Sequence, residues 1–351
     1  MSPALRRSLI AIVVLALAAG AVAVYWHWAA DRLETAIAEW TAAQRERGYE
    51  IAYQGPMIEG FPTTLAARFE EPSVASPGFA APGIASSDGW RWAGPPVSGA
   101  ARLWAPLTVE LRFPGRHEIT RQLGGVAIPG TLEAEQAAAV IELGIDGRVE
   151  RARLGMTDLA WDDPVAGQIT AAQLLATIGQ PVVATSARQD ALPLMAVVRT
   201  VMLPERLRSP LGRRLQELRI DATLRGTPPP GPLRAALSAW RDAGGVLDLH
   251  NSLLQWGPLI LSGDGTLTLD QELRPLGALS ARIRGLGAAL DKFADAGLIK
   301  RGQAIAIELA ASALAGERDA DGEQVVMLPL TLQDGRLYLG PVPLFPLSPV
   351  L

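Results

Sequence analysis

The side chains best suited to chemistry are few and far apart in this sequence. The three histidines are His27, His117 and His250, and no two of them have the short spacing typical of metal ligands. The adjacent carboxylates Asp162 and Asp163 offer acid–base chemistry, but their place just before a proline is more typical of a solvated acidic turn. The sequence therefore predicts no metal site and no catalytic residue.

Glycine-rich motifs are incomplete as well. No Gly-x-Ser-x-Gly nucleophile motif occurs, and no glycine-rich loop ends in Gly-Lys-Ser or Gly-Lys-Thr. Gly285-Leu286-Gly287 resembles the start of a dinucleotide fingerprint, but Leu290 stands where the third glycine belongs. A turn from a strand into a helix is the simpler interpretation. No cofactor is expected, although a serine nucleophile outside any motif stays open.

Composition excludes several classes of partner and fold. The formal net charge is −4, so no basic field attracts nucleic acid. Hydrophobic residues make up 49% of the chain and charged residues 19%, which is too apolar for a disordered protein. There is no cysteine, so an exported chain of this kind must be stabilised by its core and not by disulfides.

The stretch Leu9–Ala30 determines where the protein works. No Asp, Glu, Lys or Arg occurs in the 23 residues from Ser8 to Ala30. As a helix this stretch spans roughly 35 Å, enough to cross a bilayer core of about 30 Å. Basic residues precede it and aromatic residues gather at its far end, which predicts a membrane anchor with a cytoplasmic N-terminus and the rest of the chain on the far side of the membrane. These residues are Arg6 and Arg7, and Tyr25, Trp26 and Trp28.

A cleaved secretory signal is the alternative for the same stretch. Ala21-Val22-Ala23 has the small residues of a cleavage site. The apolar run is longer than a typical signal core, and helical periodicity continues beyond it, so a retained anchor is favoured. Both interpretations export the rest of the chain.

Periodicity beyond the anchor indicates one helix and then mainly strands. Asp31–Arg47 carries Leu33, Ile37 and Trp40 on one helical stripe, with Gly48 as the expected C-cap. Alternating apolar and polar residues predict strands. The clearest examples are Thr64–Glu70, Leu107–Phe113, Glu217–Arg225 and Ala278–Arg284.

Helices and turns are expected between these strands. Asp-Gly pairs predict hairpin turns at Asp146-Gly147, Asp264-Gly265 and Asp334-Gly335. The proline-rich apolar tail Pro341–Leu351 must be extended. Helices are predicted over Thr170–Ile178, Leu192–Leu207, Pro232–Ala243, Leu286–Ala296 and Gln303–Ala315.

The expected fold class is α+β, with an N-terminal transmembrane helix followed by a large antiparallel, groove- or sandwich-like β-sheet with interspersed helices. Four segments are expected. They are a cytoplasmic tip and anchor (1–30), a juxtamembrane helix (31–48), an N-terminal β-rich half (49–225) and a C-terminal β-rich half with helices and the apolar tail (226–351).

Four tryptophans in the strand-rich regions are candidates for an apolar ligand groove. They are Trp90, Trp92, Trp104 and Trp256. Trp90 and Trp92 are two residues apart and therefore share one face of a strand. The simpler interpretation makes these side chains core anchors, and the sharper one has them line a groove for lipid.

Short motifs recur in an order that points to a known family. They are Gly60-Phe61-Pro62, Trp90-Arg91-Trp92, Trp104-Ala105-Pro106, Trp256-Gly257-Pro258, Gly265-Thr266-Leu267 and the closing Asp334-Gly335 to Leu339-Gly340-Pro341. With the anchor and Trp40, they resemble an uncharacterised bacterial envelope family, domain of unknown function 2125. The C-terminal half resembles, more distantly, the AsmA-like envelope proteins, whose elongated β-grooves are implicated in phospholipid movement or outer-membrane homeostasis. Neither resemblance implies a catalytic residue.

Three functions follow from these observations. The first is a non-enzymatic, membrane-anchored periplasmic protein that binds lipid or another apolar ligand in envelope maintenance. The second is a structural or assembly factor that binds an envelope protein and has no ligand cavity. The third and least favoured is a hydrolase acting on envelope material, which requires Asp162 or Asp163 to lie beside a histidine or a second carboxylate.

Overall fold

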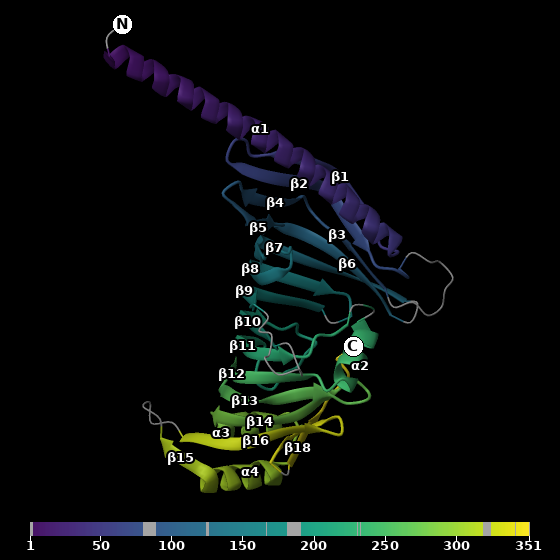
Figure 1. Cartoon of the computed structure of the whole chain (residues 1–351). Helices are drawn as coiled ribbons and strands as arrows, with labels where there is room; N and C mark the ends of the chain where they lie inside the picture. Colours follow the sequence, from purple (N-terminus) through teal and green to yellow (C-terminus); the bar gives the residue numbers. More distant parts are fainter. Residues whose placement is uncertain are drawn as a thin grey trace. The chain divides into compact units, whose positions relative to one another are not determined.

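The computed structural model describes residues 3–79, 89–123, 126–165, 167–180, 191–229, 231, 233–318, 324–340 and 342–350. They form an N-terminal apolar helix followed by antiparallel strands with a few helices, as the α+β prediction expected (Figure 1). The chain divides into two compact units. The first is Met1–Val149 with Trp161–Pro164, and the second is Glu150–Ala160 with Val165–Leu351.

The first unit is an antiparallel meander with a long helix beside its first strands. Strand β2 pairs with β1 on one side and with β3 and β4 on the other, while β5 and β6 continue to β7. Each of the pairs β3–β4 and β5–β6 acts as one interrupted strand, because both members pair with the same neighbours. The elements are α1 (Pro3–Glu46), β1 (Glu50–Glu59), β2 (Thr64–Ala75), β3 (Gly89–Ala93), β4 (Val97–Arg102), β5 (Ala105–Arg112), β6 (Gly115–Leu123) and β7 (Val126–Leu143).

Alternation gives this sheet one apolar and one polar face. Leu65 lies opposite Ala101, Ala67 opposite Gly99 and Phe69 opposite Val97. The intervening residues of β2 and β4 pair in the same way on the other face, where Thr64 lies opposite Arg102. The strand predicted from Thr64 to Glu70 is therefore confirmed, together with its two faces.

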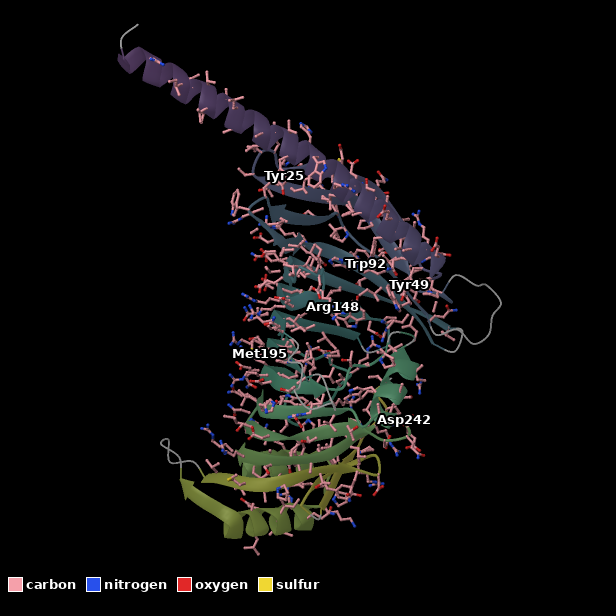
Figure 2. The ribbon with its side chains drawn as sticks, viewed as in Figure 1. Tyr25, Tyr49, Trp92, Arg148, Met195 and Asp242 are labelled. Carbon is pink, nitrogen blue, oxygen red and sulfur yellow. The ribbon has the colours of Figure 1, made fainter. Side chains whose placement is uncertain are left out.

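Helix α1 is continuous over 44 residues, roughly 66 Å. The described large apolar side chains between Ile10 and Val24 are 42–73% exposed, and Figure 2 shows Tyr25 where α1 reaches the strands. From Trp26 onward the helix packs on the sheet, and Trp26, Ala30 and Thr41 are buried. Gly48, with φ +88°, follows its end, as expected of the cap.

The second unit continues with antiparallel hairpins and three helices. The pairing runs from β9 to β14 in chain order, then from β14 to β16, and on to β17 and β18. The elements are β8 (Val149–Asp163, shared by both units), β9 (Gly167–Ile178), β10 (Ala191–Met202), β11 (Arg214–Arg225), α2 (Leu233–Asp242), β12 (Val246–Trp256), β13 (Leu259–Leu269), β14 (Pro275–Arg284), α3 (Leu286–Asp295), α4 (Arg301–Leu314), β15 (Ala315–Arg318), β16 (Gln324–Gln333), β17 (Arg336–Leu339) and β18 (Val342–Pro346). The boundary expected after residue 225 falls inside this unit, between β11 and α2.

Helices α3 and α4 cover the apolar face of β14 and β16. Ile283, Leu290, Ile307 and Val326 are buried in this core. Full burial of side chains of this size contributes about 1.5–3 kcal/mol each. The helices predicted over Pro232–Ala243, Leu286–Ala296 and Gln303–Ala315 are confirmed as α2, α3 and α4.

Two predicted helices are wrong. Thr170–Ile178 lies in β9, and most of Leu192–Leu207 lies in β10, which pairs with β9 and β11. Alanine, leucine and methionine favour helix weakly, and the pairing of neighbouring strands outweighs that preference.

The predicted turn at Asp264-Gly265 is also wrong. Gly265 lies within β13, opposite Leu279 of β14. A Cβ at this glycine would collide with the backbone of Ala278 and Leu279, so the residue permits a close approach of two strands. The turn before β13 lies instead at Gly257, with φ +57°.

The other expected turns are confirmed. Asp146-Gly147 joins β7 and β8, and Asp334-Gly335 joins β16 and β17 with positive φ at both residues. The described part of the tail, 342–350, is extended, and its first residues pair with β17 as β18. Gly285 opens α3 with φ +68°, and a Cβ there would collide with the Pro258 carbonyl. The strand-to-helix interpretation of Gly285-Leu286-Gly287 is therefore correct.

Candidate functional site

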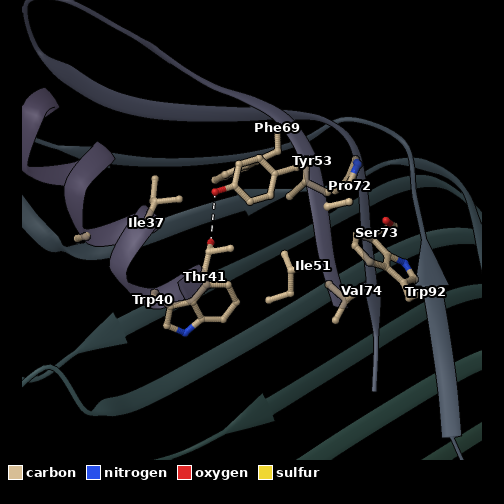
Figure 3. A pocket seen from close by; sticks show the side chains of 13 residues that line it. Ile37, Trp40, Thr41, Ile51, Tyr53, Phe69, Pro72, Ser73, Val74 and Trp92 are labelled. Carbon is tan, nitrogen blue, oxygen red and sulfur yellow. Dashed lines mark hydrogen bonds between the residues drawn. The ribbon is translucent and has the colours of Figure 1, made fainter. Parts of the chain in front are cut away.

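An apolar pocket of about 360 Å³ lies between α1 and the first strands of the first unit (Figure 3). This volume falls in the range of roughly 300–1,000 Å³ that is typical of small-molecule sites. The lining residues are Ala36, Ile37, Trp40, Thr41, Ile51, Ala52, Tyr53, Phe69, Pro72, Ser73, Val74, Trp92 and Val97.

Residues on five elements, α1 and β1 to β4, come together in this lining. Helix α1 supplies Ile37, and Trp40 and Thr41 stand three and four residues after it, on the same side of the helix. On the strands, Ile51 lies opposite Val74, and Val74 lies opposite Trp92. One cross-strand row of the sheet thus forms the floor of the pocket.

Three polar side chains of the lining, Thr41, Tyr53 and Trp92, bond to protein partners. Thr41 Oγ1 and the Tyr53 hydroxyl are 3.2 Å apart, the bond drawn dashed in Figure 3. The Trp92 Nε1–H donates to His117 Nδ1 at 3.2 Å, and His117 Nε2–H donates to the Phe113 carbonyl at 2.8 Å. With these groups satisfied, the wall presents hydrocarbon and aromatic surface, which suits an apolar ligand better than a polar one.

The sheet and the helix are tied together on both sides of the pocket. The Trp26 Nε1–H donates to the Thr64 carbonyl at 2.8 Å. At the other end, Arg45 Nη2 donates to the Ile51 carbonyl at 2.6 Å. These two bonds hold α1 against β1 and β2.

The four candidate groove tryptophans do not gather in one place. Trp92 lines the pocket, while Trp90, on the same strand, is 43% exposed and is not part of the lining. Trp104 lines a different cavity on the polar face of the sheet. Trp256 belongs to the second unit, where its Nε1–H donates to the Gly212 carbonyl at 2.9 Å.

The second cavity, of about 600 Å³, is polar. Its walls include Glu59, Arg68, Arg102, Trp104 and Arg112, contributed by β1, β2, β4, β5 and the turn between β4 and β5. Arg68 Nε donates to Glu70 at 2.6 Å, and this hydrogen bond raises the pKa of Arg68. One charged group of this cavity, Arg68, is thus paired with a carboxylate of its own strand.

Asp162 and Asp163 have different environments. Asp163 is only 5% exposed and forms an ion pair with Arg121, so its interpretation as a solvated residue is wrong. The Arg121 guanidinium also lies 5.9 Å from the Trp161 ring. Asp162 is exposed. The Asp163 carboxylate is thus paired with the Arg121 guanidinium, and this contact is an ion pair, not a pair of carboxylic acids.

The histidines are separated in space as they are in sequence. His27 stacks on Phe61 with ring centroids 6.3 Å apart, and His250 Nε2 lies 3.0 Å from Thr223 Oγ1. Among the residues that the structure describes, no three His, Asp or Glu side chains group as metal ligands.

Most of the pocket was not anticipated as a site. Ile37, Trp40 and Phe69 stood on the predicted helical stripe and strand face, where they were assigned to packing. No sequence pattern indicated that Tyr53, Val74 and Val97 would line a pocket, because the contacts that join them depend on the path of the strands.

One family model covers nearly the whole chain. Its description is an uncharacterized protein conserved in bacteria, DUF2125, and it matches residues 26–348. The chain belongs to this family. The DUF2125 match includes the pocket and both compact units. No curated protein and no solved structure matches the chain, and none of these comparisons supports the expected AsmA-like resemblance.

The N-terminal part of this DUF2125 protein contains a candidate membrane span. Within Ile12–Glu46, α1 is long and apolar enough to cross a membrane, a property that anchors and signal sequences share.

Proposed function

We propose that this protein is anchored in the bacterial inner membrane by α1, carries its β-rich body in the periplasm and binds an apolar ligand, such as a lipid acyl chain, without catalysing a reaction. The observation that carries the proposal is the apolar pocket beneath α1, on the same helix as the candidate span.

The surface of α1 supports the anchor. Leu15, Leu17 and Val24 are 69–73% exposed, although a soluble helix normally packs such side chains against a core. A hydrocarbon environment removes this cost, because lipid tails solvate apolar side chains. Arg6 and Arg7 precede the span and Asp31 follows it, which favours a cytoplasmic N-terminus.

The chemistry of the pocket supports an apolar ligand. Two of its polar side chains, Thr41 and Tyr53, bond to each other, and the Trp92 indole bonds to His117. A ligand with strong hydrogen-bonding groups would find these partners already engaged. An acyl chain needs none, and its binding is driven by the removal of apolar surface from water.

Photocrosslinking of the full chain in vesicles tests this function. The vesicles contain a phospholipid with a diazirine at the end of its acyl chain. We expect crosslinks on peptides around Ile51–Tyr53 and Phe69–Val74, besides those on the span itself. Crosslinks confined to the span would refute lipid binding in the pocket while leaving the anchor intact.

Two variants of α1 make the test specific. Ala36 lines the pocket, whereas Ala38, two residues further along the helix, is exposed and is not part of the lining. Ala36→Trp fills the pocket and should reduce the strand crosslinks at least fivefold. Ala38→Trp adds the same bulk outside the pocket and should leave them unchanged.

A further inference from the structure

Three hairpin turns at one end of the first unit expose large apolar side chains. Phe61, in the turn from β1 to β2, is 54% exposed, and Trp104, between β4 and β5, is 67% exposed. Ile145, in the turn after β7, is 99% exposed. Turns normally carry Gly, Pro, Asn, Asp or Ser at such positions.

Strands β1 and β2 run nearly parallel to the axis of α1. Trp26 and Arg45 of the helix bond to Thr64 and Ile51 of the strands. The 19 residues from Trp26 to Arg45 rise roughly 28 Å, and a strand from Ile51 to Phe61 extends roughly 33 Å. The turn end of the sheet therefore lies beside Trp26, on the side from which the apolar half of α1 emerges.

The register places the three turns at the same end of the sheet. Leu65, Ala101, Val109 and Ile141 form a single row across β2, β4, β5 and β7. Toward the turns, Phe61 is four residues from the row member of β2, Trp104 is three residues from that of β4, and Ile145 is four residues from that of β7. The first two turns are also joined directly, because the Leu103 N–H donates to the Thr63 carbonyl at 3.1 Å.

We propose that these three turns form a second membrane contact, in which Phe61, Trp104 and Ile145 insert into the headgroup layer of the bilayer that α1 spans. This contact rests on the proposed anchoring of α1. The occupant is the lipid surface because the three turns share one end of the sheet, and the turn with Phe61 packs against Trp26, where the exposed apolar part of the helix begins.

The chemistry of the surrounding residues fits this depth. Tyr25 and Trp28 are 46% and 55% exposed on α1, near the turn with Phe61, and aromatic rings prefer the interface between hydrocarbon and water. Asp146, next to Ile145, is paired with Arg148 at 3.5 Å, which reduces the cost of bringing its charge near lipid.

Spin labels on single cysteines can measure this depth in the full chain reconstituted in vesicles. The natural sequence has no cysteine, so each introduced one is the only site of labelling. The variants are Phe61→Cys, Trp104→Cys and Ile145→Cys. Val126→Cys is the matched control, because Val126 is 64% exposed at the opposite end of β7, roughly 55 Å from Leu143 along the strand.

For each label we compare the relaxation caused by oxygen with the relaxation caused by a water-soluble nickel chelate. We expect this oxygen-to-nickel ratio to be at least threefold higher at 104 and 145 than at 126. Equal ratios at 104, 145 and 126 would overturn the contact. A label at Leu15→Cys reports the span separately. If that label is in lipid while 104 and 145 are in water, this inference alone fails, and if Leu15 is also in water, the proposed anchor fails with it.

Discussion

At the scale of single residues, Trp92 connects the pocket wall to a buried polar chain. His117 is 3% exposed, and its two ring nitrogens bond to Trp92 and to the Phe113 carbonyl. A neutral imidazole with its proton on Nε2 satisfies both bonds. Removing one partner would leave a buried acceptor unpaired, which costs more than the bond itself contributes.

We therefore expect Trp92→Phe to lower the free energy of unfolding by about 1–3 kcal/mol, because His117 Nδ1 loses its donor. Urea denaturation of the full chain in detergent micelles, followed by circular dichroism, measures this change. Trp104→Phe is the control, since Trp104 is 67% exposed and its replacement should change the unfolding midpoint little. Equal midpoints for the two variants would contradict the structural role of Trp92.

At the scale of elements, the start of α3 depends on one glycine for two reasons. Gly285 has φ +68°, and a Cβ there would collide with the Pro258 carbonyl. Gly297, just after α3, has a similar φ of +73° but no heavy atom within 4 Å of a built Cβ. A comparison of Gly285 with Gly297 therefore separates the cost of backbone strain from the cost of the steric collision.

Gly297→Ala should cost about 1 kcal/mol from strain alone. Gly285→Ala should cost about 2–4 kcal/mol, because the collision adds an overpacking penalty of about 1–3 kcal/mol. The same urea denaturation measures both variants. A loss of equal size in the two would show that α3 can shift to accommodate the added methyl group.

The elements that the sequence predicted correctly are those with a local signal. The alternation of Thr64–Glu70 and the Asp334-Gly335 turn are visible in neighbouring residues and appear in the structure. Strands β9 and β10 were predicted as helices because they contain helix-favouring residues. Their strand conformation is determined instead by pairing with neighbouring strands. Gly265 was misread as a turn for the same reason, since the strand that requires it comes later in the chain.

At the scale of the whole molecule, the pocket shows what one sequence cannot reveal. Its walls come from α1 and from strands that follow it, and only their pairing brings Ile51, Val74 and Trp92 into one row. Of the four tryptophans proposed for a groove, composition alone could not indicate that Trp92 would line this pocket and the others would lie elsewhere.

The topology of the whole chain is directly testable. A reporter enzyme that is active only after export, fused behind Leu351, should be active, because Arg6 and Arg7 ahead of the apolar stretch favour a cytoplasmic N-terminus. The same reporter fused ahead of the span is the control and should be inactive. The reverse pattern would exclude a periplasmic body.

N-terminal sequencing of the membrane-bound protein completes this test. A chain that begins before the apolar stretch is the expected result for an anchor. A chain that begins just after Ala23 would show cleavage. Trp26 would remain in either product, so its bond to Thr64 is compatible with both outcomes.

The continuity of α1 has a mechanical consequence. No loop separates the candidate span from the part of the helix that packs on the sheet, and Trp26 fixes the first strands at the exit point. A domain on a flexible tether samples many heights above a membrane. Here the pocket between Ala36 and Thr41 stands at one height, roughly 15–23 Å further along the helix than Trp26. In the proposed orientation, α1 therefore sets the distance from the bilayer at which a ligand reaches the pocket.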